Sequence, residues 1–288
     1  HGDQLVDELE GWLDAGTTGP GLVALTTAAA RGGGERGRAL LLASLHDPRL
    51  EVAEAVATGL HRVRATSSAQ TVDTRARNAV GTAVDRELDR AQLVVNGLAA
   101  LEGVEGVAPL RDALRDELSE ISHRLLVLVG IVVPGISPAR VTAGLEAKDD
   151  ATRGLAEELV DVALRRRAPH VLAVVTPGLH PEQRRARLAE RTSTGTGGDA
   201  AELVRSIAVD ANDQWRDRWL RASALRVLPA VAPDAVPSVL SQLHAQPPQR
   251  AAPDLDLVLR ETVDWLAQLE ASRARRTSAS ASADAELP

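Results

Sequence analysis

Residues 203–228, LVRSIAVDANDQWRDRWLRASALRVL, carry the pattern that decides the fold. The stretch predicts a short apolar helix, a turn, and a longer helix with small residues on its inner face. The same pattern occurs in LLLASLHDPRLEVAEAVATGL at 40–60 and in VTAGLEAKDDATRGLAEELVDVAL at 141–164. The three turns share an aspartate: Asp47, Asp149 and Asp210. Because one helical pair cannot bury its apolar face alone, the recurrence predicts pairs that stack on their neighbours.

The rest of the chain also shows helical spacing of apolar residues, and no comparable stripe has a period of two. Two long stripes predict amphipathic helices over 77–100 and 108–133, which we interpret as degenerate repeats. Their apolar residues are Val80, Val84, Leu88, Ala91, Val95 and Leu98 in the first, and Leu110, Leu114, Leu118, Ile121, Leu125, Leu128 and Val132 in the second. A shorter stripe, formed by Leu155, Leu159 and Val162, predicts the apolar face of another helix. The fold class is therefore predicted to be all-α.

The hydrophobic residues are of an unusual kind. The chain of 288 residues has no Phe, Tyr, Met or Cys, and its only aromatic residues are four tryptophans. The predicted core therefore consists of Leu, Val, Ala and a few Ile, and Ala and Leu favour helices. A redesign with a reduced alphabet and a sequence that departs from the native one are both compatible with this composition. The preference for Arg over Lys, with Lys148 as the only lysine, instead indicates a high-GC source.

The domain organisation follows from the same patterns. We expect one repeat domain over residues 1–276, with clear repeats at about 38–64, 139–165 and 200–232. From 277 to 288 the chain has too little apolar content to fold, and we expect a disordered tail.

The helical pairs resemble the HEAT repeat, in which two antiparallel helices stack on neighbouring pairs. This resemblance implies a HEAT-type α-solenoid of stacked antiparallel helical hairpins.

A closer resemblance covers roughly residues 38–232. It rests on the order of LRDALRDELSEISHRLLVLVGIV (110–132), the repeat at 141–164, PEQRRARLAE (181–190) and the WLRASALRVL repeat at 219–228. This order is similar to that of the soluble HEAT-repeat region attached to bacterial membrane proteins related to the ATP/ADP translocases and the major-facilitator carriers. The resemblance implies membrane tethering through a segment that this chain lacks.

Motifs for catalysis and for metal binding do not emerge from the sequence. The histidines are scattered without an HExxH pattern, and the absence of cysteine excludes thiolate ligands and cysteine nucleophiles. The glycines of 195–198 do not continue into a phosphate-binding Gly-Lys-Ser/Thr motif. The longest apolar run, 125–136, is too short to cross a bilayer. We therefore predict no catalytic, cofactor or metal site, and a cytoplasmic location that includes membrane association in the full-length protein.

Two groups of residues are candidates for binding. The first is a run of arginines, which bind phosphate and carboxylate through a fixed fork of donors: Arg165, Arg166, Arg167, Arg184, Arg185, Arg187 and Arg191. These predict an anionic partner, such as lipid headgroups, a nucleotide or the acidic N-terminal end of another copy, although arginines solvated on helix ends would show the same pattern. The second is Trp215 with Trp219, one helical turn apart, which predict either packing between repeats or an interface.

The favoured function is that of a non-enzymatic interaction or regulatory scaffold that binds a protein partner or an acidic surface. A net charge of −7 argues against a nucleic-acid partner. Two alternatives stay open: a DNA glycosylase on a HEAT-like scaffold, and an engineered scaffold without activity of its own.

Overall fold

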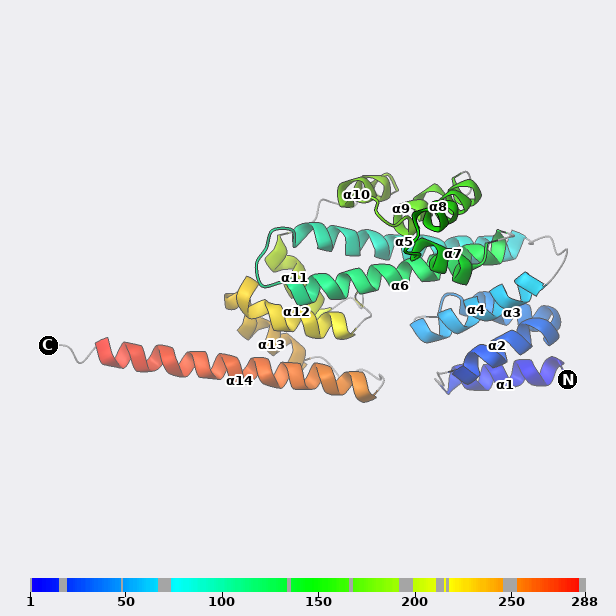
Figure 1. Cartoon of the computed structure of the whole chain (residues 1–288). Coiled ribbons are helices and arrows are strands. Elements are labelled where there is room, and N and C mark those ends of the chain that lie inside the picture. The colour runs from blue at the N-terminus through cyan, green and yellow to red at the C-terminus, as the bar shows by residue number, and fades with distance from the viewer. Residues whose placement is uncertain are drawn as a thin grey trace. The chain divides into compact units, whose positions relative to one another are not determined.

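The fold is all-α, as predicted. The computed structural model describes residues 2–15, 20–47, 49–66, 74–133, 136–165, 168–191, 199–210, 215, 218–245 and 253–284. Within these ranges the chain forms fourteen α-helices, one short 3-10 helix and no strand (Figure 1).

The helices group into two compact units. The first unit comprises His1–Leu93 and Leu118–Ser193, and the second comprises Val94–Glu117 and Thr194–Pro288. The first contains α1 (Gly2–Asp14), α2 (Pro20–Gly32), α3 (Gly34–Ser44), α4 (Leu50–Thr66), α7 (Pro138–Leu145), α8 (Asp150–Leu164), α9 (Pro169–Val175) and α10 (Pro181–Ala189). The second contains α11 (Ala200–Val209), α12 (Arg218–Val231), the 3-10 helix η1 (Pro233–Ala235), α13 (Val236–Ala245) and α14 (Pro253–Asp284). Two long helices, α5 (Thr74–Ala100) and α6 (Ala108–Val132), contribute residues to both units. The single repeat domain expected over 1–276 stays a prediction.

The core is aliphatic. Apart from Trp215, every buried hydrophobic residue that the structure describes is Leu, Val, Ile or Ala. In the first unit, one cluster joins residues of α1 to α6, among them Leu9, Leu22, Leu41 and Val56. The run Leu125–Val129 near the end of α6 is buried throughout, as expected for a buried helix end.

Small residues allow α2 and α4 to approach closely. Thr26 of α2 is fully buried, and its hydroxyl donates to the backbone carbonyl of Ala55 in α4 at 2.9 Å. A Cβ atom added to Gly59 of α4 would lie 2.7 Å from Thr26 Oγ1 and 2.9 Å from the Thr26 carbonyl carbon. The contact therefore depends on the absence of a side chain at Gly59.

Each of the three predicted repeats contains two helices with the aspartate in the turn between them: α3 and α4, α7 and α8, α11 and α12. The aspartates act differently, however. Asp47 accepts from the backbone N–H and the guanidinium of Arg49, and this pairing lowers the pKa of Asp47. Asp149 is the N-cap of α8 and accepts from the Thr152 N–H at 2.8 Å. Asp210 ends α11 with a left-handed backbone (φ 45°), a conformation that Asp tolerates.

The C-terminal helix is longer than expected. Helix α14 continues to Asp284, past residue 277, where the sequence analysis places the start of a disordered tail. Alanines recur in this last part, and alanine is the best helix former. Residues 285–288 lie outside the described residues.

The close approach of α2 and α4 predicts opposite effects for two glycine substitutions. Gly59→Ala is expected to lower the free energy of unfolding by about 1–2 kcal/mol, because the added methyl must displace Thr26. Gly81→Ala in α5 is the matched control, since a Cβ there meets no atom within 4 Å. It should raise stability by up to about 1 kcal/mol through helix propensity alone. Urea unfolding of both variants checks this, and equal shifts would contradict the close contact.

Candidate functional site

The predicted arginine group is largely engaged by the chain itself. Arg165 pairs with Asp161 one turn earlier in α8. Arg184 donates to the Thr176 carbonyl at 2.9 Å, and burial lowers the pKa of its guanidinium. Outside the described residues lie two members, Arg166 and Arg167.

Arg191 is the best-paired member of the group. Its side chain is only 12% exposed and reaches Asp89 at 3.0 Å and Asp85 at 3.3 Å, both on α5. Arg185 and Arg187 are both exposed on α10. Three of the five described members therefore bind acceptors of the same unit, and an anion would have to compete with these acceptors.

The two tryptophans do not share a helical face. Trp215 precedes α12 and is buried, and its backbone N–H donates to Asp210 Oδ1 at 3.1 Å. Trp219 lies within α12 and is half exposed. Trp215 lies outside the helix, since α12 begins at Arg218. The role of this pair as an interface stays a prediction.

Helix α8 carries an exposed apolar face, which corrects the expectation that its stripe is buried. Leu155, Leu159 and Val162 are 68%, 50% and 74% exposed. The helix instead buries its other side, where Ala156, Val160 and Leu164 are located. Helix α8 is apolar on two sides, so spacing alone does not identify the side that packs. We call Leu155, Leu159 and Val162 the α8 apolar face.

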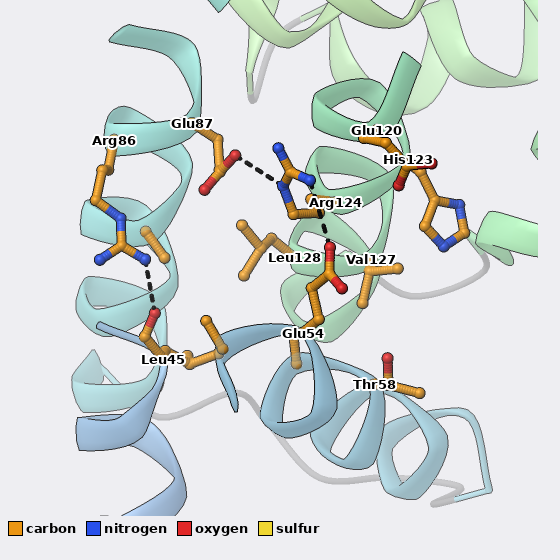
Figure 2. Close-up of a pocket in the computed structure, with 13 residues that line it drawn as sticks. Leu45, Glu54, Thr58, Arg86, Glu87, Glu120, His123, Arg124, Val127 and Leu128 are labelled. Carbon is orange, nitrogen blue, oxygen red and sulfur yellow. Dashed lines mark hydrogen bonds and ion pairs between the residues drawn. The ribbon is translucent and has the colours of Figure 1, made fainter. Parts of the chain in front are cut away.

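A polar cavity of about 280 Å³ lies within the first unit, among the end of α3 and helices α4, α5 and α6 (Figure 2). Alanines and larger aliphatic residues form part of its wall, and charged side chains together with Thr58 and His123 form the rest. Its lining comprises Leu45, Ala53, Glu54, Ala57, Thr58, Ala83, Arg86, Glu87, Glu120, His123, Arg124, Val127 and Leu128.

Arg124 of α6 is the centre of this lining. Its side chain is 7% exposed, and its Nε donates to Glu87 Oε2 of α5 at 3.0 Å. Its Nη1 donates to Glu54 Oε1 of α4 at 3.3 Å. Figure 2 shows both carboxylates directed toward the guanidinium. One cation thus connects three helices.

A second arginine holds the end of α3. Arg86 of α5 donates to the carbonyls of Leu45 at 3.1 Å and His46 at 3.2 Å. These carbonyls are at the C-terminus of a helix, where a cation interacts favourably with the helix dipole. Burial and the charge of Arg86 lower the pKa of His46.

Glu54, in the lining of the cavity, has a raised pKa. Burial raises its pKa, while Arg124 opposes this effect and Glu120 and Glu51 add to it. The attraction of Arg124 therefore compensates only part of the cost of removing this charge from water.

The cavity could not be predicted from the sequence, although one signal of a buried charge was present. Arg124 follows Ile121 by three residues and precedes Leu128 by four, so it lies on the apolar stripe of its own helix. A charge at such a position must find a partner on folding. The partners, Glu54 and Glu87, lie on other helices and cannot be read from spacing.

Nowhere in the described ranges do three His, Cys, Asp or Glu side chains converge so that they could hold a metal ion. Among the same residues, no helix combines the length and the apolar content needed to span a membrane. A scan against models of protein families, a search of curated proteins and a search of solved structures found no match.

The ion pairs of Arg124 predict a large effect of removing one partner alone. Arg124→Leu should lower the free energy of unfolding by about 3–5 kcal/mol, because the Glu87 carboxylate, 6% exposed, loses its cation. The double variant Arg124→Leu with Glu87→Leu should recover much of this loss. Urea unfolding at neutral pH measures both. A double variant as unstable as the single one would contradict a role of charge and indicate packing.

Proposed function

We propose that this chain is a non-enzymatic interaction scaffold, a HEAT-type solenoid that binds a helical segment of a partner protein through the α8 apolar face. Three helical pairs, each with an aspartate in the turn, support the solenoid part of the proposal. Their recurrence is expected of a repeat array. The exposure of the α8 apolar face is the observation that supports the binding part of the proposal.

The exposed face has the spacing used for helix-to-helix recognition. Leu155, Leu159 and Val162 follow one another by four and three residues, which aligns them along one side of α8. Full burial of such side chains yields about 1.5–3 kcal/mol each. A partner helix that covers the three therefore has a substantial driving force.

Charges on α8 favour a basic partner. Arg153 of α8 is paired with Asp150, and Arg165, which follows the helix, is paired with Asp161. Glu158 is exposed beside Leu159, and Glu157 is half-buried. A helix with an apolar face between lysines or arginines would complement this arrangement.

A second copy of the chain fits the face less well. Three side chains cover much less than the roughly 800 Å² per partner of a standard interface. Antiparallel contact of two α8 helices about Leu159 would also bring the two Glu158 carboxylates together, and like charges at close range are repulsive.

The cellular setting belongs to the same proposal. The resemblance over residues 38–232 is the support for a cytoplasmic scaffold tethered to a transporter-like membrane protein. A basic segment of that partner would be the occupant of the α8 apolar face.

A designed peptide tests the proposed binding. A short amphipathic helix of leucine and lysine, labelled with a fluorophore, should bind the wild type more tightly than the triple variant Leu155→Gln, Leu159→Gln, Val162→Gln. The expected loss is about tenfold or more in affinity, because three exposed apolar contacts are removed. Fluorescence anisotropy measures the binding.

Two controls make the result specific. Leu257→Gln removes a similarly exposed leucine of α14, 52% exposed, and should leave the affinity unchanged. A leucine–glutamate peptide of the same pattern should bind at least about tenfold more weakly, since Glu158 repels it. Equal affinity of the triple variant and the wild type would refute the proposal. So would a dimer in sedimentation that the triple variant abolishes, because a second copy would then occupy the face.

A further inference from the structure

The polar cavity is separate from the α8 apolar face, since none of the residues of that face lines it. Larger side chains at the alanine positions of its wall would fill this cavity. Ala53, Ala57 and Ala83 form part of its wall, and each is buried. Its volume of about 280 Å³ is close to the lower end of known ligand sites, about 300 Å³. A small organic molecule is the class of ligand that fits.

The charges in the lining do not balance. Three carboxylates, those of Glu54, Glu87 and Glu120, face two guanidinium groups, those of Arg86 and Arg124. Arg86 donates its hydrogen bonds to neutral backbone carbonyls and not to a carboxylate. Its positive charge therefore still counts in the total for the lining. Counted as fully ionised, the lining has an excess of one negative charge.

Both arginines of the lining already bind acceptors of the chain. Arg124 binds Glu87 and Glu54, and Arg86 binds the end of α3. The Nε of Arg86 is buried without a hydrogen-bond partner, but an anion that reached it would meet the three carboxylates of the lining. Coulomb repulsion between like charges in a partly buried site opposes this.

Two carboxylates of the lining, in contrast, can still accept hydrogen bonds from a ligand. Glu54 uses Oε1 for Arg124, and its side chain remains 40% exposed. Glu120 is exposed on α6, and among the described residues it forms no ion pair. Burial raises the pKa of Glu54, which shows that its charge is incompletely compensated in the folded chain.

We propose that this cavity binds a small organic monocation, an aliphatic amine or guanidine, with its charged end at Glu54 and Glu120 and its apolar chain against Ala57 and Val127. The cation supplies the missing positive charge, and charge-assisted hydrogen bonds to the carboxylates orient it. The aliphatic wall accepts the carbon chain. Selectivity against anions follows from the excess of carboxylates.

Three probes with the same four-carbon chain separate charge from apolar burial: n-butylamine, n-butanol and butyrate. The full chain is titrated with each at neutral pH by NMR or calorimetry. Butylamine should bind at least about tenfold more tightly than butanol, since hydrogen bonds to charged groups contribute about 1.5–3 kcal/mol. Butyrate should bind more weakly than butanol.

Variants locate the site. Glu54→Gln keeps the shape of the side chain and removes its charge, and should weaken butylamine binding by about tenfold. Glu51→Gln is the matched control, because Glu51 is an exposed glutamate of the same helix that does not line the cavity. It should change the affinity by less than about twofold, since solvent screens exposed charges.

Glu120→Gln provides a second test that does not disturb the ion pairs of Arg124, and it too should weaken butylamine binding. Butyrate that binds as tightly as butylamine would overturn the proposal. So would butylamine binding that neither Glu54→Gln nor Glu120→Gln reduces. Neither result involves the α8 apolar face. The test of the cavity and the test of the proposed function can therefore fail separately.

Discussion

Arg124 connects α4, α5 and α6 of the first unit through one buried guanidinium. A charge this deep is tolerated only where carboxylates reach it, and Glu87 and Glu54 do so from two different helices. The positions of these helices are therefore restricted by the geometry of ion pairs as well as by packing. The same requirement keeps polar groups, and with them a cavity, inside a region that aliphatic side chains would otherwise fill (Figure 2).

The lack of Phe, Tyr and Met has two opposite consequences for packing. Where small residues face each other, as Gly59 and Thr26 do, the helices approach so closely that no space is left for a Cβ atom at Gly59. Where small residues face charged ones, space remains, because Ala53 and Ala57 cannot reach across it. A core of large and adaptable side chains would fill such irregular gaps, and methionine is the usual residue for this. The close contacts and the cavity thus share one cause.

The sequence predicted the helices and the turn aspartates well, because both depend on local properties: helical spacing, helix propensity and capping. It did not predict which side of α8 packs, because Ala156, Val160 and Leu164 form a second apolar side next to Leu155, Leu159 and Val162. The partners of Arg124 could not be predicted from the sequence either, since Glu54 and Glu87 lie 70 and 37 residues away along the chain. Periodicity identifies the faces of a helix, whereas their neighbours depend on tertiary structure.

Local excess of one charge in the sequence is a poor guide to the charge of a partner. The arginines at 165–191 suggested an anionic partner, yet Arg165 and Arg191 are held by aspartates of the same unit. The carboxylates that remain without ion pairs are then the ones that a partner meets, at Glu158 on α8 and at Glu120 beside the cavity. Arg165 and Arg191 are thus satisfied within the first unit, while Glu120 and Glu158 stay exposed in a chain with a net charge of −7. Both proposed binding surfaces therefore favour cationic ligands.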